Sequence, residues 1–404
     1  MSERVVIVGA GHAALRFCEE MRGHGFNGSL TVIGNEAHRP YERPPLSKAV
    51  LCGEAIPGDH SLLSADNQSL LAIDWHGGAR VERIDRSGRN IVLADDSVYP
   101  YDRLVLATGV TPRRLDCPGS GLTGIHYLGD AECALRLRDA LDAAPQSVVI
   151  IGGGFIGLEV AAAARRQGHH VTVVESAPRC IGRLFPPSLS RSVTDLHQRN
   201  GVVIKAGVGV TAIVGRDRAT GVQLMSGETL TADLVVVGIG SLPQTELAEG
   251  CGLAVSNGIL VDPAGCTSDC AIYAIGDVAA VKDGADASPV RRESWDNAQT
   301  MAQRAAAAMM DMPQPQPKPL WFWTDQYDHN IQFIGEAGDD CDELHIERDG
   351  GGSLYLYARQ GALVAAGLVD AGRERRRIMT AIGNREPIAV VAAAFGAQTL
   401  QRAS

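Results

Sequence analysis

Two stretches of the chain share one pattern: Val5–Leu15 reads VVIVGAGHAAL, and Val148–Leu158 reads VVIIGGGFIGL. In each, an apolar run precedes glycines at alternate positions, and small or apolar residues with helical spacing follow. This order predicts a strand, a tight turn and a helix. A further strand pattern follows each stretch, at Ser29–Ile33 and His170–Val174. The repeat predicts an α/β fold with two Rossmann-like, three-layer dinucleotide-binding domains.

The rest of the chain predicts a third domain after a linker. Met312–Pro319 is rich in proline, which is incompatible with a helix or a central strand, so we expect a linker there. Strand patterns at Ile331–Gly335, Leu354–Ala358 and Leu363–Leu368, with one late helix, predict a C-terminal α+β domain. Short buried strands that run into glycine are expected at Leu104–Gly109, Leu234–Gly240 and Ala271–Asp277. We therefore expect residues 1–115 and 240–318 to form the first dinucleotide domain, 116–239 the second, and 319–404 the C-terminal domain.

The composition is that of an acidic globular protein with few aromatic residues. The 404 residues suffice for two to three domains. Lys and Arg number 37 against 47 Asp and Glu, a formal charge of −10, and aromatic residues make up 5%. Nucleic-acid binding, which needs a basic surface and stacking faces, is not expected. No apolar run reaches the ~18 residues of a membrane span, no signal peptide precedes Val5, and the nine cysteines contain no CxxC pair. We expect a soluble cytoplasmic protein with reduced thiols.

The first glycine motif predicts a site for a pyrophosphate. Gly9 forms the tight turn, Gly11 lets the backbone approach the phosphates, and Ala14 permits close packing of the helix on the strand. The free N–H groups and the dipole of the helix N-terminus favour negative charge. The ribose hydroxyls require an acid near the end of the next strand. Since position 34 is glycine, we assign this role to Glu36.

The second glycine motif is a complete GxGxxG, formed by Gly152, Gly154 and Gly157. Glu175 ends the following strand, where a carboxylate accepts both ribose hydroxyls of NAD and repels the 2′-phosphate of NADP. Arg179 lies four residues further on and weakens this preference slightly. We therefore expect NADH rather than NADPH. The alternative is that Glu175 is a solvated acid at a strand end.

Two dinucleotide sites in one chain predict a bound flavin dinucleotide and a diffusible nicotinamide. More specific strings accompany them: PYERPPLSK at 40–48, LVLATG at 104–109, AIYAIGD at 271–277, RESW at 292–295 and WFWTDQYD at 321–328. In this order the strings resemble the FAD-dependent ferredoxin reductases of oxygenase systems, within the glutathione-reductase-like superfamily. The resemblance covers nearly the whole chain.

The resemblance implies a catalytic pair, Lys48 and Glu159. Arg43 would contact the pyrophosphate or adenosine side of FAD, Lys48 would lie beside the isoalloxazine, and Glu159 would sit beside the nicotinamide and pair with Lys48. A buried lysine needs a counter-charge, and a cation near the flavin stabilises developing negative charge. The two residues would tune the rate and the potential rather than form covalent bonds. Alternatively, Lys48 is a surface lysine and Glu159 is an acid favoured by its helix N-terminus.

The resemblance also implies further FAD contacts. Thr108 and Gly109 would bind FAD, Asp277 would hydrogen-bond the ribityl chain, and Trp295 and Trp323 would lie near the flavin ring. The alternative for the tryptophans is a place in the core.

Three positions depart from the family pattern. Gly129 and Asp130 lie in a segment that replaces the Arg–Thr pair and following acid of the family, so the resemblance does not extend to a flavin or hinge contact there. Gln244 stands where asparagine is more usual, which we interpret as a mild change.

The cysteines and histidines predict neither a dithiol nor a metal site. A disulphide reductase needs two redox thiols beside its flavin. Cys266 and Cys270 lie in a loop, and we interpret them as incidental. Cys52 follows the PPLSK string rather than occupying the nucleophile position of a single-cysteine peroxidase. Electrons must then leave the flavin directly, and no metal is expected because the eleven histidines show no paired ligand spacing.

The function implied by the resemblance is that of an NADH:ferredoxin oxidoreductase. NADH would reduce FAD, and FAD would pass electrons one at a time to a [2Fe–2S] ferredoxin that feeds a ring-hydroxylating dioxygenase or a cytochrome P450. The alternatives are a rubredoxin reductase or NADH oxidase of the same fold, an apoptosis-inducing-factor-like signalling flavoprotein, and a non-catalytic dinucleotide sensor.

A ferredoxin partner predicts a local basic surface despite the net charge of −10, because ferredoxins are generally acidic. The candidate docking residues are Arg373, Arg375, Arg376 and Arg377, with Arg291 and Arg292 nearer the flavin strings. The alternative is that the arginine run is a solvated helix face. We expect no membrane partner, and a monomer or a homodimer.

Overall fold

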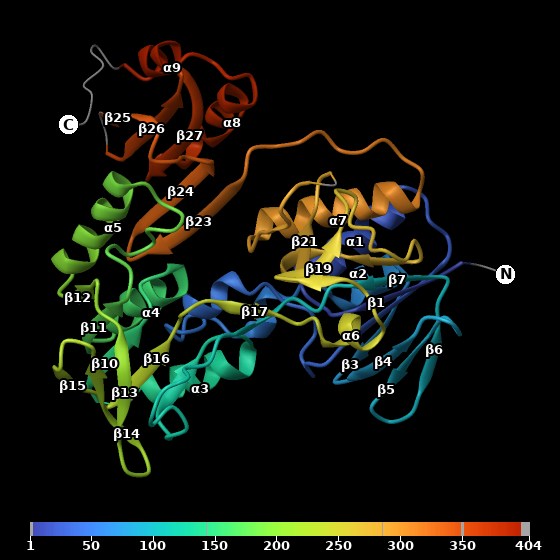
Figure 1. Cartoon of the computed structure of the whole chain (residues 1–404), viewed down its shortest axis with the longest axis horizontal. Helices are drawn as coiled ribbons and strands as arrows, with labels where there is room; N and C mark the ends of the chain where they lie inside the picture. The colour runs from blue at the N-terminus through green and yellow to red at the C-terminus, as the bar shows by residue number, and fades with distance from the viewer. Residues whose placement is uncertain (1–2, 143, 285, 349–350, 397–404) are drawn as a thin grey trace. The chain divides into compact units, whose positions relative to one another are not determined.

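The computed structural model describes residues 3–142, 144–284, 286–348 and 351–396. The chain forms two compact units, and the colours of Figure 1 show that each is assembled from segments far apart in the sequence. Unit 1 contains Met1–Arg43, Ile56–Thr111 and Ser241–Gln316, and unit 2 contains Pro44–Ala55, Pro112–Gly240 and Pro317–Ser404. The expected domain limits at residues 115, 239 and 318 remain predictions.

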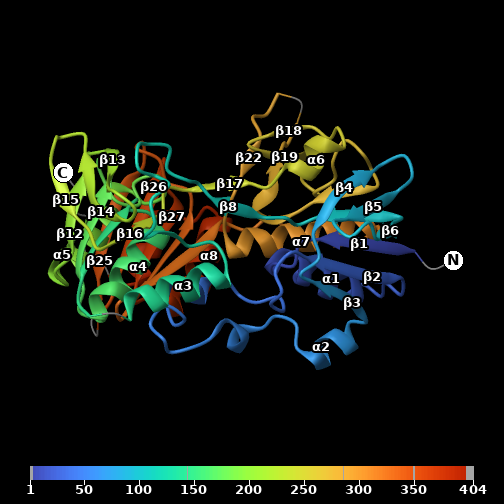
Figure 2. The ribbon, with the colours of Figure 1, turned by 90° about the horizontal axis from the view of Figure 1, so that it is seen from below.

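A five-stranded parallel sheet forms the centre of unit 1. Its strands are, in order across the sheet, β20 (Ile272–Ala274), β7 (Arg103–Leu106), β1 (Arg4–Val8), β2 (Ser29–Gly34) and β3 (Ile73–Gly77). The apolar residues of β1 are all buried, as a central parallel strand covered on both faces requires. The chain turns at Gly9 into α1 (His12–Gly23), which lies beside α7 (Trp295–Met309) in Figure 2. The first predicted strand–turn–helix–strand unit is confirmed.

Smaller elements complete unit 1. An antiparallel sheet contains β4 (Val81–Asp85), β5 (Asn90–Leu93) and β6 (Val98–Pro100), and a four-stranded sheet contains β18 (Val255–Ser256), β19 (Gly258–Val261), β21 (Ala279–Val281) and β22 (Val290–Arg291). The short helices are α2 (Ala65–Leu70), α6 (Glu246–Gly250), η2 (Pro57–His60) and η3 (Gly276–Val278). Two short strands near the unit limits, β8 (Val110–Pro112) and β17 (Ser241–Pro243), pair with each other.

Unit 2 repeats the parallel arrangement. Its first sheet contains, in order, β12 (Val203–Ala206), β11 (His170–Glu175), β10 (Ser147–Ile151), β16 (Leu234–Val237) and β9 (Ile125–Tyr127). The helices are η1 (Pro44–Ser47), α3 (Ala131–Leu141), α4 (Phe155–Arg166) and α5 (Pro187–Arg199), and an antiparallel sheet adds β13 (Val210–Gly215), β14 (Ala219–Leu224) and β15 (Thr229–Thr231). The turn at Gly152 joins β10 to α4, and β11 pairs with β10 in parallel. The second predicted repeat is therefore confirmed.

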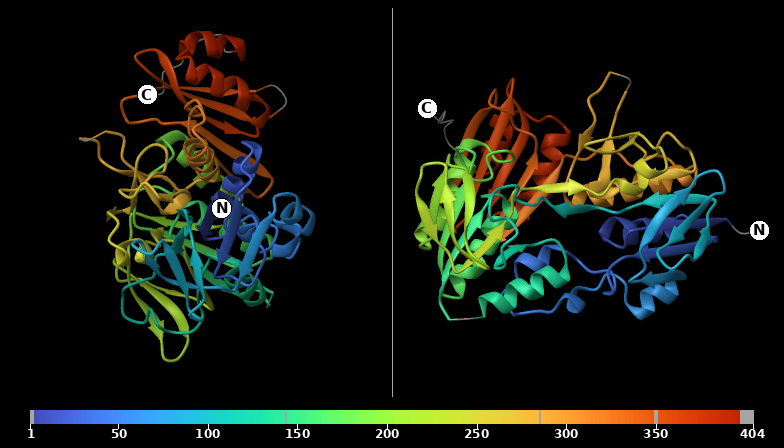
Figure 3. Two further views of the ribbon diagram at one scale, coloured as in Figure 1. Left: turned by 90° about the vertical axis from the view of Figure 1, so that its right-hand side faces the viewer. Right: turned by 60° about the horizontal axis from the view of Figure 1, so that its bottom comes forward.

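The C-terminal part of unit 2 is an antiparallel sheet with helices on one face. The strand order is β23 (Trp321–Gln326), β24 (His329–Gly335), β27 (Ala362–Val369), β26 (Ser353–Arg359) and β25 (Asp342–Glu347). After η4 (Gly372–Glu374), α8 (Arg375–Gly383) and α9 (Ile388–Ala394) pack on this sheet, as Figure 3 shows. The linker is confirmed, since residues 310–320, all of them described, contain no helix or strand.

Two differences separate the predicted C-terminal domain from the structure. Strands β23 and β25 accompany the three predicted ones, and both are edge strands whose polar residues obscure an apolar pattern. The expected single late helix is wrong, because the helix ends at Gly383 and Pro387 caps a second one. Proline at the start of a helix is favourable because its missing N–H would have no partner there.

Candidate functional site

The turn after β1 is shaped to hold a phosphate. Gly9 has a φ of +107°, and a Cβ there would lie 2.1 Å from the carbonyl oxygen of Ala107. Gly11 caps α1 without a side-chain hydrogen bond, and no atom lies within 4 Å of where its Cβ would stand. Gly11 therefore leaves room beside the N-terminus of α1, whose first N–H groups have no partner within the helix, which is the usual arrangement for binding an anion. Ala14, predicted to allow close packing, is fully buried.

His12, the first residue of α1, marks this turn as a ligand site. Both of its ring nitrogens are buried and lack a hydrogen-bond partner among the described residues, and its ring stacks on Trp295 with the centroids 4.4 Å apart. Burial lowers the pKa of His12 to about 4, so the imidazole is neutral. A buried polar group without a partner is unfavourable, and a dinucleotide bound at the turn would supply one. The residues present therefore fit FAD, and His12 is a site residue that sequence reasoning missed.

Glu36 and Arg43, predicted as separate FAD contacts, lie together after β2. The guanidinium of Arg43 is 2.7 Å from Glu36 Oε1, and the Tyr41 hydroxyl donates a hydrogen bond to Glu36 Oε2. Arg43 also lies over the Tyr41 ring, 5.6 Å from its centroid. The carboxylate is thus held in one orientation in unit 1.

Gln244 is hydrogen-bonded to Thr108 and Gly109, the last two residues of the LVLATG string. The Thr108 hydroxyl donates to the Gln244 carbonyl at 2.8 Å, and Gln244 Nε2 donates to the Thr108 carbonyl at 2.7 Å. The Gln244 N–H donates to the carbonyl of Gly109, whose φ of +67° favours glycine. The change from asparagine at position 244 therefore lies in contact with two of the predicted FAD residues.

Asp277 lies in η3, next to a buried arginine. Burial raises the pKa of Asp277 to about 7; Glu293 raises it further, and Arg291 and Arg43 lower it. Arg291 donates to the backbone carbonyl of Asp277 and pairs with Glu293 at 2.7 Å. Because the Arg291 side chain is only 7% exposed, it is not available as a docking residue.

The turn after β10 repeats the construction of the first turn. Gly152 has a φ of +111°, and a Cβ there would lie 2.2 Å from the Gly238 carbonyl oxygen. A Cβ on Gly157 would lie 2.0 Å from the carbonyl oxygen of Gly152, so helix and turn meet at van der Waals distance. Gly154 caps α4 and faces open space. These residues fit a second dinucleotide.

Glu175, the last residue of β11, is fixed by backbone donors at this turn. Its Oε2 accepts the N–H of Gly153 at 2.7 Å, and its Oε1 accepts the N–H of Ala177 at 2.7 Å. Arg179 donates instead to the carbonyl of Gly182 within its own loop. The carboxylate therefore stands beside the phosphate turn in the position that the sequence predicts for binding ribose.

A buried ion pair lies elsewhere in unit 2. Glu159, in the second turn of α4, is 7% exposed, and Lys48 Nζ is 3.0 Å from its Oε1. The Ser47 hydroxyl donates to Oε2, and the Thr324 hydroxyl donates to Oε1 at 2.6 Å. A buried carboxylate requires this kind of pairing and hydrogen bonding. The structure thus brings together the two residues predicted as catalytic.

Ser47 and Thr324 are residues of this cluster that sequence reasoning missed. Both lie inside the strings that carry the family resemblance, PYERPPLSK and WFWTDQYD. Trp323, from the second string, stacks on Trp321 with the centroids 4.8 Å apart. The roles of Trp295 and Trp323 near the flavin remain predictions.

The positions that depart from the family pattern have local structural roles. Asp130 caps α3, accepting the Cys133 N–H at 2.7 Å. A Cβ on Gly129 would lie 2.7 Å from Cδ of Pro112. The small residue and the capping acid therefore suit the start of α3.

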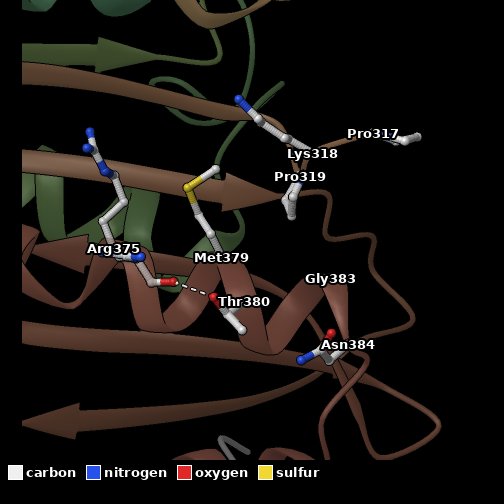
Figure 4. A pocket seen from close by; sticks show the side chains of 9 residues that line it. Pro317, Lys318, Pro319, Arg375, Met379, Thr380, Gly383 and Asn384 are labelled. Carbon is white, nitrogen blue, oxygen red and sulfur yellow. Dashed lines mark hydrogen bonds between the residues drawn. The ribbon is translucent and has the colours of Figure 1, made fainter. Parts of the chain in front are cut away.

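The predicted docking arginines differ in their availability. Both nitrogens of the Arg377 guanidinium fork are bound to Glu386, at 3.0 and 2.6 Å, whereas Arg373 and Arg376 are exposed. Arg375 lies over the Trp321 ring, 4.1 Å from its centroid. Figure 4 shows Arg375 and Met379 extending from α8 toward the segment that carries Lys318. Together with Arg376 these residues line a hollow of about 400 Å³.

Neither a metal-binding cluster nor a membrane-spanning helix occurs among the described residues. They contain no group of three or more His, Cys, Asp or Glu side chains able to hold a metal ion. No helix within those ranges has the length and apolar character needed to cross a membrane.

Two Rossmann-like sheets with glycine turns, followed by an α+β domain, define an oxidoreductase that uses a flavin and a nicotinamide. The chain belongs to the pyridine nucleotide-disulphide oxidoreductase family, which it matches over residues 3–303. Residues 321–403 match the reductase C-terminal family. The α/β fold class and the use of FAD and NADH are confirmed.

The individual relatives are ferredoxin-type reductases. Rhodocoxin reductase from Rhodococcus erythropolis is 41% identical over 349 residues, which is 86% of this chain and 82% of the relative. The structure resembles that of putidaredoxin reductase in its covalent complex with putidaredoxin, with 33% identity, a TM-score of 0.89, and coverage of 98% of this chain and 99% of that one. It also resembles the ferredoxin reductase for the CYP199A2 system from Rhodopseudomonas palustris, with 36% identity, a TM-score of 0.87 and 93% coverage of both chains. The resemblance predicted from the sequence is confirmed.

Proposed function

We propose that this protein is an NADH-dependent FAD reductase that passes electrons one at a time to a [2Fe–2S] ferredoxin serving an oxygenase. The buried Lys48–Glu159 pair carries the proposal. It joins the PYERPPLSK string, the helix that follows the second glycine turn, and, through Thr324, the WFWTDQYD string. Rhodocoxin reductase and putidaredoxin reductase, each named for its iron–sulphur partner, support this kind of acceptor.

The chain would bind both dinucleotides through its glycine turns. In unit 1, the N-terminus of α1 and the Glu36–Arg43 pair would hold FAD, with Thr108, Gly109, Asp277 and Trp295 as further contacts. Bound FAD supplies hydride acceptance and one-electron transfer. In unit 2, the N-terminus of α4 would bind the pyrophosphate of NADH, and Glu175 its ribose. Glu159 would orient the nicotinamide, and Lys48 would place a positive charge where negative charge develops.

The thiols do not support a dithiol relay. Burial raises the pKa of Cys18 to about 12 and that of Cys180 to about 11, and it also raises the pKa values of Cys52 and Cys266. A thiol must ionise to act as a nucleophile, so these groups are poor redox participants. Direct transfer from the flavin to an external one-electron acceptor agrees with this chemistry.

The acceptor would dock on a local basic surface. Lys318, Arg375 and Arg376 line one hollow, Arg373 is exposed two residues before Arg375, and these residues are the candidate surface on an otherwise acidic chain. We place the protein in the cytoplasm, as a monomer or a homodimer, since the electron transfer requires neither a membrane nor a particular assembly.

The test is an NADH-dependent reduction assay with purified [2Fe–2S] ferredoxins, run beside rubredoxin and oxygen. We expect flavin absorbance in the purified protein and turnover at least tenfold faster with a ferredoxin than with either alternative acceptor. Faster turnover with rubredoxin or with oxygen would overturn the proposed acceptor. Protein that folds but binds no flavin would overturn the function as a whole.

A further inference from the structure

A row of buried polar side chains in unit 2 ends on the carboxylate of Glu159. Thr324, Gln326 and His197 are each 0% exposed, and Glu159 is 7% exposed. Thr324 Oγ1 is 2.6 Å from Glu159 Oε1, Gln326 Nε2 is 3.2 Å from Thr324 Oγ1, and His197 Nε2 is 2.6 Å from Gln326 Oε1. The Tyr327 hydroxyl, 3.2 Å from His197 Nδ1, completes the row. Buried polar groups are unfavourable unless they are paired, and here every member is.

The backbone explains why these side chains meet. Alternate residues of a strand point to one face, so Phe322, Thr324 and Gln326 of β23 share a side. Phe322 packs against Phe155 at the start of α4, with the ring centroids 5.7 Å apart. This contact places Thr324 and Gln326, the next two residues on that side of β23, close to α4, which carries Glu159. His197 contacts Gln326 from α5.

The chemistry of each group fixes the direction of every hydrogen bond. The Thr324 hydroxyl has one proton, which it donates to Glu159, so it accepts from the Gln326 amide. The Gln326 oxygen can only accept, so His197 Nε2 carries a proton. Burial lowers the pKa of His197 to about 4, so the ring is neutral and Nδ1 accepts from the Tyr327 hydroxyl. Every donor in the row therefore points toward Glu159.

We propose that His197 is a positioning residue for Glu159, acting in its Nε2–H tautomer through Gln326 and Thr324. The aligned donors hold Oε1 in place and favour its negative charge, while Ser47 holds Oε2 and Lys48 supplies the counter-charge. Hydrogen bonds in such a row polarise one another, so the loss of a distant member weakens the bond at the carboxylate. The inference rests on the proposed role of Glu159 beside the nicotinamide.

A second buried histidine of unit 2 provides the contrast. His169 is also 0% exposed, but its partners are the Leu141 carbonyl oxygen and the Gln146 N–H, both of the backbone. Within the described part of the chain, its hydrogen bonds lead to no other side chain. His169→Asn is therefore a matched control for the loss of a buried imidazole that has no connection to Glu159.

The first experiment measures the reduction of bound FAD by NADH in stopped-flow absorbance, with no acceptor present. His197→Asn removes the donor to Gln326, and we expect the rate constant to fall about fivefold to tenfold with FAD content unchanged. His197→Gln, whose amide nitrogen can replace Nε2, is expected to recover at least half of the rate, and His169→Asn to leave it within twofold of wild type. Equal slowing by both asparagine variants, or an unchanged rate in His197→Asn, would overturn the proposal.

A double-mutant cycle then tests whether His197 acts through Glu159. In a Glu159→Ala background, His197→Asn is expected to slow the reaction less than twofold further. A full, independent effect in that background would show a general structural role and overturn the proposal. Because these measurements use only NADH and FAD, they remain valid if the ferredoxin assay fails.

A spectroscopic test is independent of turnover. The tautomer of His197 can be read from two-bond ¹⁵N–¹H correlation spectra of holoenzyme labelled with ¹⁵N-histidine. The signals of His197 are identified by their absence from the spectrum of His197→Gln. We expect a neutral ring protonated at Nε2, and a downfield change of its Nδ1 resonance in Tyr327→Phe, which removes the donor. A charged ring or an Nδ1–H tautomer at neutral pH would overturn the assignment.

Discussion

Lys48 Nζ lies 3.0 Å from Glu159 Oε1, in a pair whose side chains are 19% and 7% exposed. Removing one member of a buried pair leaves the other charge buried without its counter-charge, which costs several kcal/mol. We expect Glu159→Ala to slow hydride transfer from NADH at least tenfold while FAD stays bound, because the FAD turn lies in unit 1 and the carboxylate in unit 2.

Stopped-flow absorbance of flavin reduction measures this effect. Glu228→Ala is the matched control, since its pair with Lys205 at 2.9 Å is much more exposed and exposed pairs contribute little. An unchanged rate in Glu159→Ala would exclude the carboxylate from the NADH reaction.

A second prediction concerns Glu175 and the preference for NADH over NADPH. Glu175→Gln keeps an acceptor for one of the two backbone N–H groups but loses the charge that repels a 2′-phosphate. We expect the ratio of kcat/KM for NADH to that for NADPH to fall about tenfold. Arg179→Ala is the control, because Arg179 donates to the Gly182 carbonyl. A larger change in the ratio with Arg179→Ala than with Glu175→Gln would make the arginine the determinant of specificity.

The sequence predicts the parts of the fold that have a strict local pattern. The turns at Gly9 and Gly152 require positive φ and leave no space for a Cβ, so glycine at those positions indicates the backbone directly. The same holds for β1 and β10, whose apolar runs identify central parallel strands. The second C-terminal helix lacks such a pattern, because α9 has only 7 residues and begins directly after Pro387, four residues beyond the end of α8.

The site is only partly visible in the sequence, because its members come together through tertiary packing. Lys48 and Glu159 could be named from motifs, but Ser47 and Thr324 are ordinary polar residues until they are seen to hydrogen-bond one carboxylate. His12 stands out only when both ring nitrogens are found buried without a partner. No spacing rule connects residues whose contact depends on how a strand packs against a helix.

The basic surface of α8 gives a prediction for the partner. The double variant Arg375→Glu and Arg376→Glu is expected to raise the KM for ferredoxin about fivefold and to flatten its dependence on salt, because steering between opposite charges is screened by ions. Steady-state ferredoxin reduction at several ionic strengths measures both effects. The double variant Arg199→Glu and Arg216→Glu, at two exposed positions of unit 2, controls for the change in net charge because it also replaces two arginines by glutamates. Equal effects of the two double variants would mean that docking depends on overall charge rather than on α8.

The carboxyl of Asp277 is expected to lower the stability of the flavin-free protein at neutral pH and to strengthen the binding of FAD. Burial raises the pKa of Asp277 to about 7, above the ordinary value of 3.8 that it regains on unfolding. Between these values the unfolded chain loses the proton while the folded flavin-free chain keeps it, so this group lowers the free energy of unfolding as pH rises from 4 to 7. Asp277→Asn removes that dependence. We expect its stability relative to wild type to increase by about 2 kcal/mol between pH 4.5 and 8, roughly half of the full linkage value because the side chain is partly exposed.

Urea denaturation of flavin-free protein at the two pH values measures this change, and Asp283→Asn, at an exposed position of the same unit, is the control. FAD titration of the same variants is expected to show at least tenfold weaker binding for Asp277→Asn alone, because the amide replaces the carboxyl predicted to bind the ribityl chain. Such a pair of results identifies a residue retained for binding at the expense of stability. If Asp277→Asn instead destabilises the flavin-free protein equally at both pH values, the carboxyl is a structural group, and its raised pKa has no bearing on FAD.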